Sequence, residues 1–255
     1  MNRIEVKVLN RSAVKEAEKN MIFAARLTQR GHKISTMDDL LSLYEQPFSE
    51  DTLGAICGLP HPTVQKFAVI TVAVVGASRR FLSQITRHQN EVKFMSASLQ
   101  YSNYSDKADF AIPYEILAAP ESVRRLYLKG CQANMDCYKQ LCGAGVGHDA
   151  AGYAMPQGLR NILIISATPY QWKHMIGQRI CRRNTDETRL VLLMVWRELY
   201  ALSPTLFAPE LTGAFCQREI CKEGKMTCGK SIHADMTPAK ILAADYPLLM
   251  EGGAA

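Results

Sequence analysis

The stretch Phe67-Ala-Val-Ile-Thr-Val-Ala-Val-Val-Gly76-Ala-Ser-Arg79 carries the strongest structural signal of the 255-residue chain. Valine, isoleucine and threonine dominate it, and these β-branched residues favour strands. It is far shorter than the roughly 18 apolar residues that a membrane helix needs. We therefore predict a buried strand over 67–75, ended by Gly76.

The segments around this strand predict helices and further strands. After Gly76, the residues Phe81, Leu82 and Ile85 fall on one side of a helix that runs from Ser78 to His88. Elsewhere the patterns predict a strand over 4–9, a helix capped by Ser12, short helices capped by Ser35 and Ser49, a helix over 120–142, a strand around 163–165, and one or two long helices over 169–202. Gly143, Gly145 and Gly147 follow a helix, so we interpret them as its terminating loop.

Strands and helices do not alternate regularly, which favours an α+β fold over a doubly wound parallel sheet. We expect one mixed α/β domain over residues 1–255, with a central, mostly antiparallel sheet flanked by helices. Residues 216–255 form its C-terminal tail in this interpretation.

The composition is that of a soluble globular protein, with 47% hydrophobic and 21% charged residues. The net charge of +6 suits an anionic small molecule and is too small and scattered to indicate nucleic acid. Charges interrupt the N-terminus at once, so we predict no signal peptide, no membrane association and a cytoplasmic location.

The eight cysteines are interpreted as reduced thiols, because no export signal is present. Cys216, Cys221 and Cys228 lie in the tail, with His233 close behind. They lack tight paired-cysteine spacing, so we predict no metal and keep a structural zinc ion as the lesser alternative.

Two blocks of polar residues carry the chemistry. The first is Gly76-Ala-Ser78-Arg79, then Gln84, Arg87-His88 and Ser98-Leu-Gln100-Tyr101. The second is His174-Met-Ile-Gly-Gln-Arg179-Ile-Cys-Arg-Arg183-Asn-Thr-Asp-Glu187. On a continuous helix, Arg179, Arg183 and Glu187 share one face, so Glu187 can pair with Arg183 and leave Arg179 free for a ligand. Taken singly, each block is also explained by solvated charges on a helix.

Together the blocks resemble the flavin-dependent thymidylate synthase family. Its members carry a Gly-x-Ser-Arg turn before Gln-x-x-Arg-His-Arg, then a Ser-x-Arg-Tyr segment and a later His-x-x-x-x-Arg-x-Cys-x-Arg helix. Leu59-Pro-His61-Pro-Thr63 and the tail segment 221–229 resemble two further family segments, so the likeness spans about residues 59–230.

The resemblance implies a methyltransferase that works as a homotetramer with FAD at its subunit interfaces. Such an enzyme takes a methylene group from methylenetetrahydrofolate, uses NADPH to reduce the flavin, and converts dUMP to dTMP. It needs no cysteine nucleophile.

The resemblance also implies site residues by position. Arg179 is the expected catalytic residue, which binds the uracil edge and favours its N3-ionised form. The expected FAD-binding residues are Thr63, Arg87, His88, Gln89, Ser96, Thr168, Tyr170 and His174. The expected nucleotide-binding residues are Gln84, Arg87, Ser98, Gln100, Gly152 and Arg179.

Several of these positions depart from the family pattern. Gln89 and Gln100 replace arginines, and Gly152 occupies the place of a phosphate-binding arginine. Other departures are Lys66-Phe67 for Glu-His, Thr168 and Tyr170 for Asn and Arg, Thr185 for Gln, and one extra residue between His88 and Ser98. Three readings stay open: an active thymidylate synthase with a rebuilt site, a paralogue that acts on another pyrimidine nucleotide or has lost turnover, and a non-catalytic flavin- or nucleotide-binding protein. Lys93, Arg160 and Lys173 are candidates to replace the lost phosphate-binding cations.

Overall fold

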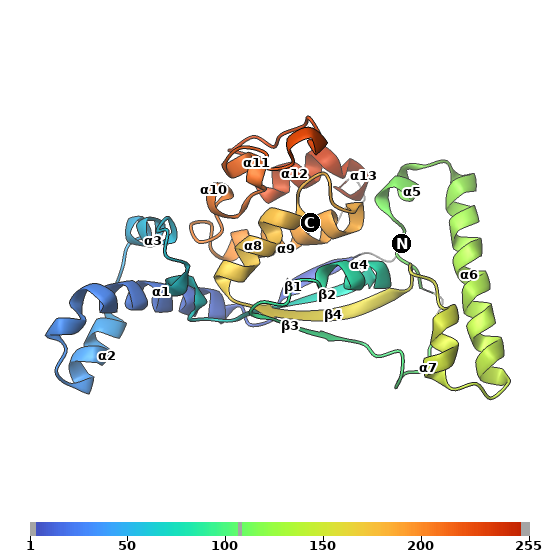
Figure 1. Cartoon of the computed structure of the whole chain (residues 1–255), viewed down its shortest axis with the longest axis horizontal. Helices are drawn as coiled ribbons and strands as arrows, with labels where there is room; N and C mark the ends of the chain where they lie inside the picture. Colours follow the sequence, from blue (N-terminus) through green and yellow to red (C-terminus); the bar gives the residue numbers. More distant parts are fainter. Residues whose placement is uncertain (1–3, 107–108, 251–255) are drawn as a thin grey trace.

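A four-stranded antiparallel sheet forms the centre of the protein in the computed structural model, which describes residues 4–106 and 109–250 (Figure 1). Its strand order is β1-β2-β4-β3. The strands are β1 (Glu5–Val8), β2 (Ile70–Ser78), β3 (Val92–Ser96) and β4 (Arg160–Ala167). The prediction of a mixed α/β fold with an antiparallel sheet is confirmed.

The side chains of strand β2 alternate between two environments, and one of its faces forms the middle of the core. Ile70, Val72 and Val74 are buried under the helices, where Trp172 and Trp196 also pack. The opposite face of the sheet stays exposed at Val75 in β2, Met95 in β3 and Ile162 in β4. Figure 1 shows the helices gathered over one face of the sheet rather than flanking both.

The expected end of β2 at Gly76 is wrong, because the strand continues to Ser78 through a β-bulge. The pairing with β4 shifts between Val75 and Ala77, and Gly76 adopts a φ of +87°. A Cβ at Gly76 would overlap the guanidinium of Arg160, so the bulge requires glycine for both its conformation and its space.

Thirteen helices are described around the sheet. They are α1 (Ser12–Arg30), α2 (Met37–Glu45), α3 (Glu50–Cys57), α4 (Arg79–Ile85), α5 (Tyr114–Ala118), α6 (Glu121–Gly143), α7 (His148–Ala151), α8 (Pro169–Arg179), α9 (Asp186–Leu202), α10 (Pro209–Thr212), α11 (Phe215–Arg218), α12 (Pro238–Asp245) and α13 (Pro247–Met250). Helices α8 and α9 cover the sheet, α10 to α13 lie over them, and α6 stands at one end of the molecule (Figure 1). No helix in the described part of the chain is both long and apolar enough to cross a bilayer.

The local predictions hold best where one residue sets the boundary. Ser49 caps α3, and the glycine-rich stretch ends α6 with Gly145 at a φ of +87°. Thr36 rather than Ser35 caps α2, and Arg11 precedes α1, so Ser12 is its first residue and not its cap. These differences shift boundaries by one residue and leave the core unchanged.

Candidate active site

Helices α4 and α8 bring two distant histidines and one arginine into contact. His88 follows the end of α4, and His174 and Arg179 lie on the second half of α8. The Arg179 Nε donates a hydrogen bond to His88 Nε2 at 2.7 Å, and its Nη2 donates to the Gln84 carbonyl oxygen at 3.1 Å. The rings of His88 and His174 meet edge to face, with centroids 6.2 Å apart.

His88 must be neutral at Nε2 to accept this bond. Burial, followed by the charges of Arg179 and His174, lowers the pKa of His88 from 6.5 to about 4. The pKa of His174 is also lowered, by burial and by Arg218. Both histidines therefore act as neutral groups near pH 7, and the positive charge of the cluster belongs to its arginines.

Positive charge accumulates here without a compensating carboxylate. Arg87 is exposed, and its charge lowers the pKa of Arg179 after the larger effect of burial. In residues 4–106 and 109–250, neither Arg87 nor Arg179 forms an ion pair with an acidic side chain. We call Gln84, Arg87, His88, His174 and Arg179 the histidine–arginine cluster. Its geometry suits an anionic or electron-rich ligand.

Glu187 fixes the start of α4 rather than pairing with Arg183. It accepts hydrogen bonds from the Ser78 backbone N–H at 2.7 Å and from the Ser78 hydroxyl. The Ser78 Oγ in turn accepts from the Phe81 N–H as the N-cap of α4. The predicted helical face of Arg179, Arg183 and Glu187 is wrong, because α8 ends at Arg179 and α9 begins at Asp186.

A second group of contacts surrounds the N-terminus of α8. Thr168 caps α8 by accepting from the Gln171 N–H at 3.3 Å, and its hydroxyl lies 3.5 Å from Glu91 Oε2. Lys66 pairs with Glu91 at 2.7 Å, and its ammonium lies 5.1 Å from the centre of the Tyr170 ring. Thr168, Tyr170 and Lys66, three residues that differ from the family pattern, are thus linked through Glu91 and the Tyr170 ring.

Ser98, Gln100 and Gly152 lie in a different part of the molecule, and we call them the Ser98 group. The Ser98 Oγ accepts from the Gln100 and Tyr101 N–H groups, which makes it a turn-stabilising residue in this state. Gly152 packs near Leu99, which contacts the small hydrophobic core under α6 and α7. Among the described residues, no hydrogen bond, ion pair or ring contact joins the Ser98 group to the histidine–arginine cluster.

The remaining predicted residues have less defined surroundings. Thr63 lies in the short 3-10 helix Pro62–Lys66, Gln89 follows the cluster, and Ser96 ends β3. Thr63 and Gln89 are exposed, and Ser96 is half-buried.

The three candidate cations lie in different environments. Lys93 is exposed on the open face of the sheet, while Arg160 lies over Gly76 and approaches Asp109 at 3.6 Å. Lys173 is buried with no hydrogen-bond partner for its ammonium in the described structure, and burial lowers its pKa to about 8. A phosphate cannot reach Lys173 in this conformation.

Sequence reasoning missed two residues of the site. Arg218 of α11 reaches Gly177 of α8, and its charge lowers the pKa values of Lys173 and His174. Asn184 accepts from Arg179 Nη1 at 3.3 Å and orients the guanidinium. Asn184 lies inside the second block of polar residues, so its contact with Arg179 could have been anticipated. Nothing in the local sequence distinguishes Arg218.

The arrangement can bind an anion and polarise a ring edge. It offers the hydrogen-bonded guanidinium of Arg179, the exposed guanidinium of Arg87 and two neutral imidazoles, without an activated nucleophile in the cluster. Within the described residues, no group of three or more histidine, cysteine, aspartate or glutamate side chains is placed to hold a metal ion.

The fold is of mixed α/β class, with a cluster of arginine and histidine side chains between α4 and α8, and comparison with known families makes the assignment specific. The family described as thymidylate synthase complementing protein matches residues 8–205. The chain therefore belongs to the family of flavin-dependent thymidylate synthases, which are methyltransferase enzymes.

Curated relatives and solved structures agree with this membership. The flavin-dependent thymidylate synthase of Geobacter sulfurreducens is 28% identical over 180 residues, which cover 70% of this chain and 76% of the relative. The Thermococcus onnurineus enzyme of the same name is 26% identical over 180 residues, covering 68% and 73%.

Two solved structures share the fold. The UMP/dUMP methylase PolB from Streptomyces cacaoi, bound with 5-Br dUMP, aligns with a TM-score of 0.66 and 14% identity over 81% of this chain and 94% of that chain. Thymidylate synthase X from Helicobacter pylori, with FAD and dUMP, aligns with a TM-score of 0.57 and 13% identity over 81% and 98%.

Proposed function

We propose that this protein is a flavin-dependent thymidylate synthase that methylates dUMP to dTMP, with methylenetetrahydrofolate as carbon donor and NADPH as reductant. The contact between Arg179 and His88 carries the proposal, since it joins the two sequence blocks that resemble the family. A bound pyrimidine nucleotide in both structural neighbours supports the substrate class.

The residues present fit a flavin dinucleotide. Arg87 offers an exposed guanidinium, without an ion pair among the described residues, that suits the pyrophosphate; Thr168 caps α8, and His174 lies on the same helix beside His88. Thr63, Gln89, Ser96 and Tyr170 complete the proposed FAD-binding set. FAD supplies the redox chemistry when it is bound, and the protein contributes binding and orientation.

Arg179 is the proposed catalytic residue because it is the fixed cation of the cluster. Its three hydrogen bonds, to His88, Gln84 and Asn184, hold the guanidinium plane in place before any ligand arrives. A preorganised cation beside the uracil edge stabilises the N3-ionised form at little reorganisation cost.

The proposed assembly is a homotetramer in the cytoplasm. The open face of the sheet supports self-association, because it exposes Val75, Met95 and Ile162 side by side on neighbouring strands. In the described chain no helix covers this face, and a second copy would bury it (Figure 1).

Complementation of a thymidine-requiring cell tests the proposed reaction. Growth without thymidine is expected from the wild-type gene, and the purified protein should be yellow and tetrameric. A colourless monomer that takes up no added FAD and fails to complement would refute the proposal.

A paralogue that methylates a different pyrimidine nucleotide is the second candidate. It is favoured by the printed name of one structural neighbour, a UMP/dUMP methylase, which covers a ribonucleotide as well as a deoxyribonucleotide. Turnover of UMP in place of dUMP by the purified protein would establish this alternative. Bound flavin without NADPH oxidation or methylation of either nucleotide would instead indicate a non-catalytic flavin protein.

A further inference from the structure

The turn between α8 and α9, residues 180–185, contains the residue that orients the Arg179 side chain. Arg179 is the last residue of α8, and Asn184 in the turn accepts a hydrogen bond from its Nη1 at 3.3 Å. The Asn184 amide nitrogen donates to the Gln178 carbonyl oxygen at 2.7 Å, which fixes the amide in this orientation. The direction of the Arg179 guanidinium therefore depends on where the turn lies.

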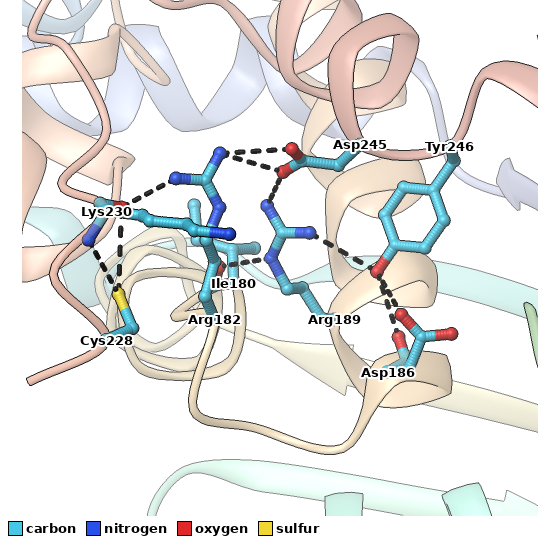
Figure 2. Close-up of polar contacts among 8 residues, drawn as sticks. All are labelled: Ile180, Arg182, Asp186, Arg189, Cys228, Lys230, Asp245 and Tyr246. Atoms are coloured by element: carbon cyan, nitrogen blue, oxygen red, sulfur yellow. Dashed lines mark hydrogen bonds and ion pairs between the residues drawn. The ribbon is translucent and has the colours of Figure 1, made fainter. Parts of the chain in front are cut away.

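One carboxylate from the C-terminal tail holds this turn at two points. Figure 2 shows Asp245 of α12 accepting hydrogen bonds from Arg182 in the turn, at 3.0 and 3.2 Å, and from Arg189 of α9. The Arg189 Nε also donates to the Ile180 carbonyl oxygen at 2.9 Å, in the residue that directly follows Arg179. Asp245 thus reaches the start of the turn through Arg189 and its middle through Arg182.

Tyr246 adds a contact where the turn ends. Its hydroxyl donates to Asp186 Oδ1 at 2.9 Å, at the first residue of α9, and accepts from Arg189 Nη1 at 3.4 Å (Figure 2). Burial raises the pKa of Tyr246, so the hydroxyl keeps the proton that it donates near neutral pH. We call Asp245 and Tyr246 the C-terminal clamp.

The clamp depends on the negative charge of Asp245. Within the part of the chain that the structure describes, Asp245 is the only acidic side chain that pairs with Arg182 or Arg189. An amide at this position would lose the charge and would turn an NH2 donor toward a guanidinium donor. Such a change releases the turn, whereas Ile241 and Leu242 keep α12 packed against the core.

We propose that Asp245 is a positioning residue, which sets the direction of the Arg179 guanidinium by holding the α8–α9 turn. This inference rests on the proposed function, because it needs Arg179 to act on the pyrimidine. Asp245 lies beyond residue 205, where the family match ends, so the matched region does not include it. The competing role for Asp245 is to stabilise the tail without any effect on Arg179.

A double-mutant cycle between Asp245 and Arg179 in the FAD-loaded protein tests the inference. Asp245→Asn should lower kcat/KM about tenfold for the nucleotide that wild type methylates, the scale of one charged hydrogen bond. The loss should fall mainly on kcat, because a misdirected cation stabilises the transition state less. In the R179A background the same change should alter kcat/KM by less than about twofold, because the residue that it positions is gone. Asp245→Glu keeps the charge and should recover part of the loss.

Asp235→Asn is the matched control. Asp235 is an exposed acid of the same tail, and it pairs with Lys240 of α12 at 3.9 Å without contacting the turn. D235N should stay within about twofold of its parent in both backgrounds. Thermal melting and flavin content show whether the variants fold. If D245N does not fold, Arg182→Gln gives the same cycle from the side of the turn, since Arg182 is only half-buried and its loss leaves the Arg189–Asp245 pair in place.

The outcomes separate the two proposals. A wild type that methylates no pyrimidine nucleotide would refute the proposed function, and with it the role of Arg179 that this inference needs. An active wild type whose kinetics do not change in D245N or R182Q would overturn the inference alone. An equal loss from D245N in the wild-type and R179A backgrounds would also overturn it, since Asp245 would then stabilise the fold without acting through Arg179.

Discussion

The histidine–arginine cluster and the Ser98 group were predicted for the same ligand, yet their structures differ. In the cluster, side chains from α4 and α8 contact one another directly and carry positive charge that no carboxylate neutralises. In the Ser98 group, Ser98 bonds to its own turn and Gln100 is exposed and uncharged. We therefore expect the cluster to contribute more of the nucleotide-binding energy than the Ser98 group.

Replacing one residue from each region gives the largest expected contrast. Arg179→Ala should lower kcat/KM for dUMP by at least about 100-fold, the scale of losing one preorganised donor. Arg179→Lys should recover only part, because lysine lacks the planar fork. Gln100→Ala should change kcat/KM by less than about threefold. Steady-state kinetics measure all three, and comparable losses in R179A and Q100A would contradict the comparison.

The pH dependence of stability tests the neutral His88 at the centre of the cluster. Its pKa is lowered to about 4, so the folded state resists a proton that the unfolded chain accepts near pH 6.5. The stabilisation is complete above about pH 6.5 and is lost as the pH falls toward 4. Between pH 6.5 and 4, the free energy of unfolding of wild type should fall by roughly 2–3 kcal/mol more than that of His88→Gln, because glutamine keeps an acceptor and does not titrate.

Urea unfolding at pH 4, 5, 6 and 7 measures this difference. Parallel pH profiles for wild type and H88Q would show that His88 does not titrate as inferred. A variant far from the cluster, His32→Gln, is the matched control, because His32 is exposed and should show the wild-type profile.

Substitutions of Glu187 test how much its hydrogen bonds to Ser78, at the start of α4, stabilise the fold around the cluster. Glu187→Ala leaves the Ser78 N–H and hydroxyl without their acceptor and should cost about 2 kcal/mol of unfolding free energy. Glu187→Gln keeps an acceptor oxygen and should cost less. Denaturant unfolding gives the stabilities, and equal losses in both variants would show that packing rather than hydrogen bonding determines the effect.

The sequence predicted the elements whose signals are local. The β-branched run of β2, the apolar stretch of β4 and the amphipathic helix α6 were identified within a few residues of their observed limits. The β-bulge at Gly76 was not, because it is a shift in the pairing with β4, and the space beside Gly76 is filled by Arg160, a distant residue of that strand. Regular strand patterns give no sign of such a contact.

The candidate site shows the same division between local and distant information. Family resemblance selected His88 and Arg179, which the structure places 2.7 Å apart at Nε2 and Nε. Helical spacing alone misassigned Glu187, because the chain turns between Arg179 and Asp186 and the partner of Glu187 is Ser78. Arg218 belongs to α11, far along the chain from Gly177 of α8, so no local pattern could have identified their contact.

The smallest expected effect concerns the contacts at the N-terminus of α8. Their charge character is intermediate between that of the histidine–arginine cluster and that of the Ser98 group. The Lys66–Glu91 pair is charged like the cluster, but it is neutralised and about one-third exposed, with side-chain exposures of 34% and 39%. Glu91 also adopts a φ of +55°, a backbone conformation that is uncommon outside glycine. The free-energy cost of this conformation offsets part of the stabilisation from the ion pair. Lys66→Ala should therefore lower stability by less than about 1 kcal/mol.

Flavin binding should respond more clearly than stability to this change. Lys66 lies against Tyr170 and, through Glu91, next to Thr168, and both are proposed FAD-binding residues. Lys66→Ala should weaken FAD binding severalfold, roughly the 0.5–1 kcal/mol of a partly exposed cation–π contact. Flavin fluorescence titration measures the affinity. Lys33→Ala is the control, because Lys33 is an exposed lysine in the 3-10 helix Gly31–Lys33 that follows α1. If K66A, E91Q and their double variant bind FAD as wild type does, these contacts only shape the N-terminus of α8, and the flavin affinity resides in the histidine–arginine cluster.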